Sequence, residues 1–176
     1  MPSAAVSYVI YVTVMIGISA AVIFFFMSYS SILTRDLIEP QMNEVANYIC
    51  ENILKVYTLV NTSDSNMIVK ELNIPSNIMN KGYFVEIVKL GEVKYLVLRL
   101  KVEPWTEIYK RIPLQGDIAS IDYIDGESFS YGNGWRAYQQ HRVDSGYAGL
   151  TNYRVLVFAR RENGRIILGL AWAEKT

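Results

Sequence analysis

Oxygen-bearing side chains gather in one short stretch, "GDIASIDYIDGES", which covers residues 116–128. Carboxylate oxygens are ligands that Ca²⁺ prefers, so this stretch is a candidate calcium site. The acidic residues in it are Asp117, Asp122, Asp125 and Glu127. Their spacing does not match an EF-hand loop, and solvated turn residues are the interpretation that we favour. The sequence therefore predicts no metal site and no cofactor.

The chain contains a single histidine and a single cysteine. His141 stands next to Arg142 and could contact an anion, but an ordinary surface pair is the more common role of two such residues. Cys50 has no partner for an intramolecular disulfide, and we expect a buried small side chain rather than a reactive thiol. No Gly-rich phosphate loop, serine–histidine–acid set or paired-carboxylate site can be assembled. We expect a protein that is not an enzyme and has no small-molecule substrate.

Aromatic side chains are concentrated in "FSYGNGWRAYQQ", which covers residues 129–140. They could form a surface that binds sugar or protein, or they could fill a small β core. What region 129–141 contacts is left open by the sequence. Lys+Arg and Asp+Glu both total 17, so no basic excess points to nucleic acid as a partner.

A long uncharged stretch precedes these residues. "AAVSYVIYVTVMIGISAAVIFFFMSYS" covers residues 4–30, and the first charged side chain is Arg35. A helix needs about 20 apolar residues to cross a bilayer, whereas the apolar part of a signal peptide has about 7–15. We therefore predict that residues 1–34 form an intact transmembrane helix and that membrane lipid is a partner.

Small residues interrupt this apolar run near its middle, and they are Gly17, Ser19, Ala20 and Ala21. Small side chains let membrane helices approach closely, so Gly17, Ala20 and Ala21 form a predicted helix-packing face. Lys and Arg beside the run hardly distinguish the two orientations. We place the C-terminal part outside the cytoplasm because it has the pattern of a compact β domain.

Residues 35–61 have the pattern of an amphipathic helical extension. Apolar side chains recur at helical spacing and predict a buried seam. The seam consists of Met42, Val45, Ile49, Val56 and Leu59, with Asn52 as a polar exception that could fix register. Either the seam packs on the chain's own β domain, which we favour, or it pairs with another helix. Pro40 predicts a kink or break at residues 36–40.

From residue 62 to residue 176 the apolar period changes to two, which predicts an antiparallel β-sheet or β-sandwich domain. We expect strands in "MIVKELNIP", "YFVEIVKL", "KYLVLRLKVE" and "YRVLVFARRENGRIILGLAWA". The last strand has two apolar or small faces, so we expect it to be central or to be covered by the long helix. An edge strand is expected in "EPWTEIYKRIPLQ", because its prolines cannot donate to a ladder. Shorter strands are expected around residues 120–124 and 135–141. In the third strand, Leu96, Leu98, Leu100 and Val102 should share a face. Asn61 begins an N-glycosylation pattern, Asn-Thr-Ser.

This order of elements, an α+β fold with a long N-terminal helix, resembles type IV pilin-like membrane-anchored proteins of archaea. The opening "AAVSYVIYV" is similar to the start of the mature archaeal pilin helix. "ANYICENILKVYTLV" followed by "LNIPSNIMNKGYFVEI" is similar to the helix-then-strand pattern of such proteins. The resemblance implies a structural or accessory subunit of a surface filament, which associates with itself or with other pilin-like subunits through the N-terminal helix.

A second interpretation keeps the same architecture without assembly. The helix would then be a single-pass tether, and the β domain would bind cell-envelope components or partner proteins outside the membrane. Filament cores need helices that pack on each other, whereas a tether accepts almost any apolar sequence. The sequence predicts location at the cell membrane in both cases, or in a surface filament in the first.

Overall fold

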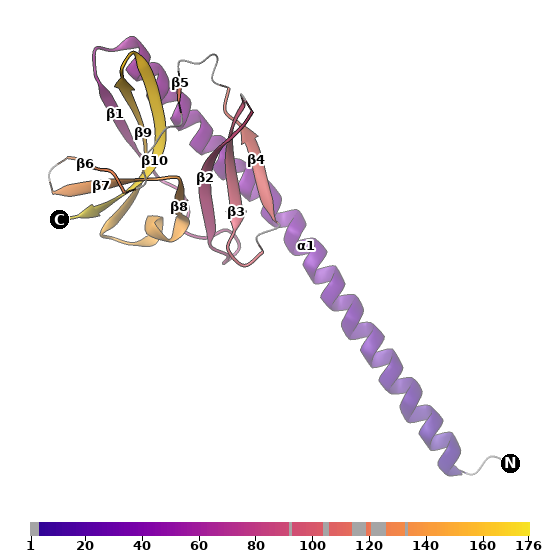
Figure 1. Ribbon diagram of the computed structural model, residues 1–176. Coiled ribbons are helices and arrows are strands. Elements are labelled where there is room, and N and C mark those ends of the chain that lie inside the picture. The colour runs from indigo at the N-terminus through magenta and orange to yellow at the C-terminus, as the bar shows by residue number, and fades with distance from the viewer. Residues whose placement is uncertain (1–3, 92, 104–105, 114–118, 121–125, 133) are drawn as a thin grey trace. The chain divides into compact units, whose positions relative to one another are not determined.

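The computed structural model describes the backbone of residues 4–91, 93–103, 106–113, 119–120, 126–132 and 134–176. It divides into two compact units, Met1–Glu39 and Pro40–Thr176. The first unit contributes the N-terminal part of helix α1, and the second contains the rest of that helix with every strand that the structure describes (Figure 1). The predicted α+β fold with a long N-terminal helix is confirmed.

Helix α1 runs without interruption from Ala4 to Thr62, with Pro40 inside it. A kink or break was expected at residues 36–40; the break is wrong, and the kink stays a prediction. Proline removes one backbone hydrogen bond, but the turns on both sides keep theirs, and both flanking sequences have helical apolar spacing. Pro40 instead marks the residue at which the second compact unit begins. The sequence predicted a helical extension over residues 35–61 and a β domain over residues 62–176. The boundary between them falls inside the second unit, because residues 40–62 belong to that unit.

The strands form two sheets. The six-stranded sheet has the order β1-β9-β10-β7-β6, and β5 joins it through a short parallel pairing with β10. Its strands are β1 (Met67–Leu72), β5 (Ala119–Ser120), β6 (Ser128–Ser130), β7 (Trp135–Gln140), β9 (Tyr153–Glu162) and β10 (Arg165–Lys175). The four-stranded sheet has the order β4-β3-β2-β8. Its strands are β2 (Tyr83–Leu90), β3 (Val93–Leu100), β4 (Glu107–Arg111) and β8 (Arg142–Asp144).

Period-two patterning located the main strands correctly. The expected edge strand is β4, at one end of the four-stranded sheet, and the expected central strand is β10. Of the strand expected around residues 120–124, only Ser120 is described, and it lies in β5; residues 121–125 lie outside the described residues. Leu96, Leu98 and Leu100 are fully buried, but β3 ends at Leu100 and Val102 is exposed, so its expected place in the strand is wrong.

Short connections and one arginine join the two sheets of the second unit to each other and to α1. Gln140 ends β7 and Arg142 begins β8, so a single residue separates a strand of one sheet from a strand of the other. A short 3₁₀ helix, η1 (Ser145–Gly149), follows β8 and leads back toward β9. Arg161 of β9 meets the end of α1, where its Nη2 donates to the carbonyl oxygens of Val60 and Ser63 at 2.5 and 3.3 Å. The arginine thereby satisfies the Val60 carbonyl, which the helix terminus leaves without an intrahelical donor, and the Ser63 carbonyl just beyond the helix.

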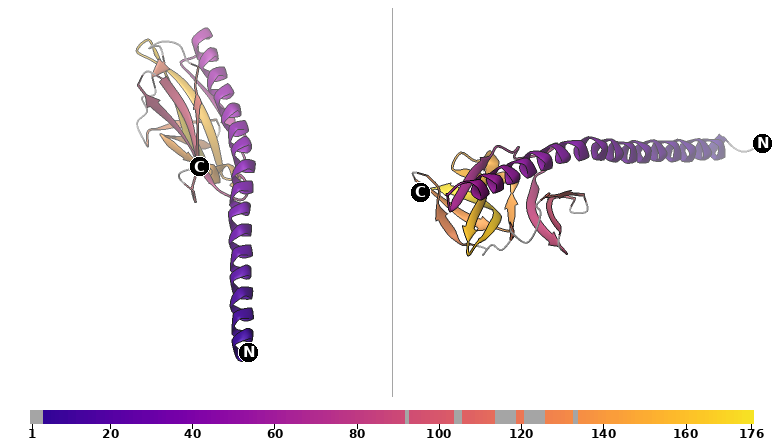
Figure 2. Two further views of the ribbon diagram at one scale, coloured as in Figure 1. Left: turned by 90° about the vertical axis from the view of Figure 1, so that its right-hand side faces the viewer. Right: turned by 90° about the horizontal axis from the view of Figure 1, so that it is seen from above.

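Residues 40–62 of α1 run beside the strands of both sheets in each view of Figure 2. The helix therefore forms a layer over the β structure of the second unit. The reason lies in a continuous row of buried apolar side chains along this part of the helix.

Candidate functional site

The first candidate site is the helix face around Gly17. Residues Val6–Tyr29, a stretch of 24, form a helix long and apolar enough to cross a membrane, and the most apolar part of this stretch has no buried residue in the structure. Apart from the two neighbouring residues and the nearby backbone of the same helix, a Cβ built at Gly17 meets no described atom within 4 Å. Thr13, Gly17 and Ala21 are spaced by four residues and lie in one row, with Ala20 beside it. The Thr13 hydroxyl donates to the Val9 carbonyl at 2.9 Å, so the hydroxyl donor is satisfied within the helix.

A shallow apolar groove follows another side of the same helix segment. It is lined by Tyr11, Val12, Met15, Ile16, Ser19, Ala20 and Ile23. Ser19 and Ala20 form its floor because larger side chains flank them at helical spacing. Of the predicted packing residues, Ala20 therefore borders both the Gly17 row and this groove. The segment offers small residues on more than one side.

The second candidate is the predicted seam on residues 40–62. Met42, Val45, Ile49 and Val56 are buried, but Leu59 is 51% exposed and does not belong to the buried row. The fully buried row continues instead through Ala46, Ile53 and Val60. Ala46, Ile53 and Val60 each lie four residues after Met42, Ile49 or Val56. The prediction instead placed the next seam residue three positions later, at Val45, Asn52 and Leu59. Both spacings fit one helix face, so the period alone could not choose between them.

The row packs inside the second unit. The side chain of Asn52 is buried, and its Nδ2 donates to the Tyr48 carbonyl of its own helix at 2.7 Å. This bond satisfies one donor of the Asn52 side-chain amide within α1. Cys50 is buried as expected, and burial raises the pKa of its thiol to about 11. At neutral pH the thiol is protonated and therefore a poor nucleophile.

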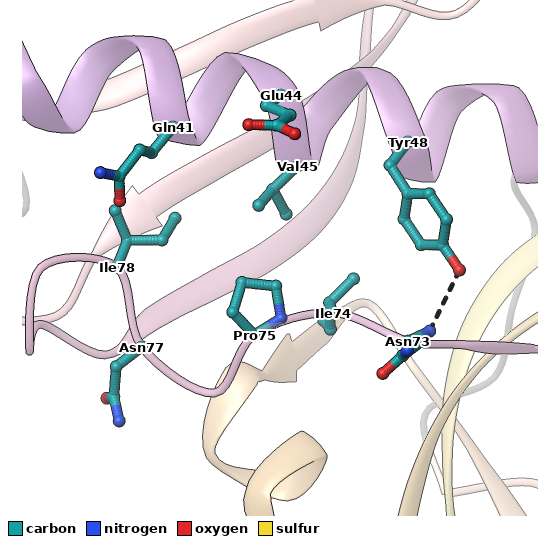
Figure 3. Close-up of a pocket in the computed structure, with 9 residues that line it drawn as sticks. All are labelled: Gln41, Glu44, Val45, Tyr48, Asn73, Ile74, Pro75, Asn77 and Ile78. Atoms are coloured by element: carbon teal, nitrogen blue, oxygen red, sulfur yellow. Dashed lines mark hydrogen bonds between the residues drawn. The ribbon is translucent and has the colours of Figure 1, made fainter.

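A groove of about 500 Å³ lies between α1 and the loop that follows β1 (Figure 3). Its lining consists of Gln41, Glu44, Val45, Tyr48, Asn73, Ile74, Pro75, Asn77 and Ile78. The Asn73 amide donates to Tyr48 Oη at 3.2 Å, which fastens one end of the loop to the helix. Glu44 is the one charged side chain of this lining, so the groove offers neither a nucleophile–base pair nor a metal-ligand set. Sequence reasoning did not locate this groove; the turn-forming residues of "NIPSN" were its only local signal.

Glu127, a member of the acidic stretch, is occupied by protein partners. It accepts hydrogen bonds from Gln139 Nε2 at 3.0 Å and from Arg160 Nη1 at 3.2 Å. Gln139 is fully buried, and Arg160 also pairs with Glu162 at 2.9 Å. These pairs raise the pKa of the Arg160 guanidinium. The other acidic residues, Asp117, Asp122 and Asp125, lie outside the described residues.

His141 and Arg142 lie at the junction of β7 and β8. Arg142 pairs with Glu86 at 3.6 Å, and its guanidinium stands 5.2 Å from the centre of the Phe84 ring. These contacts join β8 to β2. Arg142, which the sequence offered as an anion contact, therefore interacts with residues of its own chain. Among the described residues, no group of three or more His, Cys, Asp or Glu could hold a metal ion.

The aromatic residues of region 129–141 contact the six-stranded sheet. Phe129 packs against Phe158 edge to face with ring centres 5.6 Å apart, and Trp135 lies against the Arg154 guanidinium. Tyr138 stacks on Trp172 at 4.7 Å. Tyr147 of η1 stacks on Trp172 as well, at 5.0 Å. The described aromatics of this region therefore serve the packing of the sheet, and they attach η1 to it.

Asn61 lies in the last turn of α1 and is exposed, so its side chain is accessible in the folded chain. Nothing beyond the Asn-Thr-Ser pattern bears on its modification. No family model matches this chain, and comparison with curated proteins and with solved structures gives no match.

Proposed function

We propose that this chain is a single-pass membrane protein that assembles with copies of itself, or with related subunits, through the Gly17 face of its N-terminal helix. In this proposal it is a structural or accessory subunit of a pilin-like surface filament, with the second unit outside the cytoplasm. The chain is then not an enzyme, and the work of the molecule is assembly.

The observation that carries the proposal is the environment of Gly17. Glycine in a helix interior costs about 1 kcal/mol relative to alanine, so its presence calls for a reason. Apart from the two neighbouring residues and the nearby backbone of its own helix, no described atom lies within 4 Å of a Cβ built there, so packing among the described residues does not supply that reason. A second helix packed on the row of Thr13, Gly17 and Ala21 would supply it, because small residues at this spacing allow membrane helices to approach closely.

A tether without assembly is the competing function. It needs only a helix of sufficient length and apolar character, which Val6–Tyr29 also satisfies. The large side chains Phe24, Phe25 and Phe26 suit lipid as well as a protein interface. Within the N-terminal helix, the two functions therefore differ in what touches the Gly17 row.

Disulfide crosslinking in membranes tests this difference. A Thr13→Cys chain places a thiol in the Gly17 row, and the native Cys50 is buried and unreactive. Copper-phenanthroline oxidation should yield crosslinked dimers of this chain. Adding Gly17→Leu should reduce them several-fold, because the leucine side chain holds the helices apart. Electron microscopy of the sheared cell-surface fraction should then show loss of filaments.

The matched control is Val22→Phe, which adds bulk about 140° around the helix from Gly17. It should leave crosslinking at Thr13→Cys unchanged. If Gly17→Leu crosslinks as strongly as its parent, the assembly function is wrong and the monomeric tether replaces it. Carbonate extraction of each variant separates loss of packing from loss of membrane insertion.

A further inference from the structure

The groove between α1 and the loop after β1 has two walls, and both belong to the second unit. Gln41, Glu44 and Tyr48 are spaced by three and four residues, so they share one side of α1. Figure 3 shows Gln41 and Tyr48 directed from the helix toward the loop, with Pro75 on the opposite wall. Gln41 and Tyr48 are separated by about 10 Å along the helix axis. The groove is therefore elongated along α1.

The floor of the groove is apolar. Val45 of the helix is buried, and so are Ile74 and Ile78 of the loop. Gln41, Glu44 and the loop residue Pro75 are exposed above them, so the groove is open to solvent along its length. An apolar floor beneath polar rims suits a long side chain that has an aliphatic stem and a polar head.

Glu44 stands out among the acidic residues of the second unit. Among the described residues of this unit, it is the one glutamate that makes neither an ion pair nor a side-chain hydrogen bond. The other described glutamates of the unit all have such a partner, and they are Glu51, Glu71, Glu86, Glu103, Glu107, Glu127, Glu162 and Glu174. The groove therefore carries one negative charge that this chain leaves unbalanced.

The chemistry of the rim indicates a planar cation. A guanidinium group carries five N–H donors and can bind a carboxylate such as that of Glu44 through two of them. Gln41 adds an amide oxygen one turn away on the same side of α1. The Tyr48 ring is 37% exposed and offers an aromatic face to a cation. Arginine combines this head group with an aliphatic stem, whereas lysine lacks the planar fork.

We propose that this groove binds an arginine side chain of a partner polypeptide. The aliphatic stem lies on Val45 and Ile74, and the guanidinium pairs with Glu44 beside Tyr48. An open, elongated groove accepts a side chain whose backbone continues over the surface, which favours a polypeptide as the partner. This contact gives the second unit a recognition site of its own, and it does not depend on assembly through Gly17.

Peptide titration of the full chain in uncharged detergent micelles tests the proposal. The probe is a capped Ala-Ala-Arg-Ala-Ala peptide, and its dissociation constant is measured by saturation-transfer NMR. The matched probe has citrulline in place of arginine, which keeps the size of the side chain and removes its charge. The citrulline peptide should bind about tenfold more weakly, because a charge-assisted hydrogen bond is replaced by a neutral one.

Two variants locate the binding site. Glu44→Gln should weaken binding of the arginine peptide about tenfold and should leave binding of the citrulline peptide nearly unchanged. Asp64→Asn is the matched control, because Asp64 is exposed just after α1, outside the groove, and its replacement removes the same charge. It should leave binding of both peptides unchanged. Both replaced side chains are exposed, and thermal unfolding by circular dichroism confirms that each variant is folded.

Each contrary result overturns a defined part of the proposal. Equal binding of the arginine and citrulline peptides, or no binding of the arginine peptide, shows that the groove does not recognise a cation. Unchanged binding in Glu44→Gln places the site elsewhere on the chain. Free L-arginine that binds as tightly as the peptide would assign the groove to a small molecule and overturn the polypeptide partner.

Discussion

At the scale of single residues, the contact between Gly169 and Phe158 shows how tightly the six-stranded sheet is packed. The two residues are directly opposite in the β9–β10 pair, and a Cβ built at Gly169 would lie 2.4 Å from Phe158 Cζ. Gly169→Ala should therefore lower the free energy of unfolding by about 1–3 kcal/mol through overpacking. Urea unfolding of a chain that begins at Pro40 measures the change.

Phe158→Leu provides the control for this contact. The smaller side chain removes the ring atoms that a Cβ would meet, so the cost of Gly169→Ala should shrink in its presence. A double-mutant cycle measures this coupling. If the changes in unfolding free energy of Gly169→Ala and Phe158→Leu were strictly additive, the steric explanation would be wrong. The cost of Gly169→Ala would then come from backbone propensity.

At the scale of elements, the C-terminal part of α1 is a structural layer of the second unit. Ile53 is fully buried in its apolar row, whereas Leu59, six residues later, is 51% exposed. Ile53→Ala should lower the free energy of unfolding by about 2–5 kcal/mol, because it removes buried methyl groups and leaves a cavity. Leu59→Ala should change it by less than about 0.5 kcal/mol. Denaturant unfolding of the chain that begins at Pro40 distinguishes the two.

A chain that begins at Asn61 extends the same argument to the whole row. It lacks every buried side chain of α1 and exposes the apolar surface that they cover. We expect it to lose most of its cooperative unfolding transition while retaining strand-type circular dichroism. Equal stability of the chains that begin at Pro40 and at Asn61 would show that the row is not needed for the fold of the sheets.

At the scale of the whole molecule, the exposed apolar helix should decide where the chain resides. Side chains from Val6 to Tyr29 would meet water if the chain were dissolved, which the hydrophobic effect opposes. The full chain should therefore remain in the membrane pellet after extraction with alkaline carbonate. The chain that begins at Pro40 should appear in the supernatant. Release of the intact full chain would contradict anchoring by this segment.

Regular patterns account for the parts of the fold that could be predicted. Period-two alternation located β1, β2, β3, β9 and β10, and a single uncharged run located the candidate span. The short strands β6 and β8 were not predicted, because each has three residues and too few alternations to produce a pattern. The expectation of a kink or break left the continuity of α1 through Pro40 open, because one missing backbone hydrogen bond does not decide whether the flanking turns stay helical.

The sequence by itself determined the composition of each face: which stretch is apolar all round, which helix face is apolar, and which strands alternate. Only the tertiary structure decided what each face touches. It placed Val60 rather than Leu59 in the buried row and paired Glu127 with Arg160 and Gln139. The reason is physical, because period depends on the geometry of one element, whereas contacts between residues far apart in the chain depend on how several elements pack together.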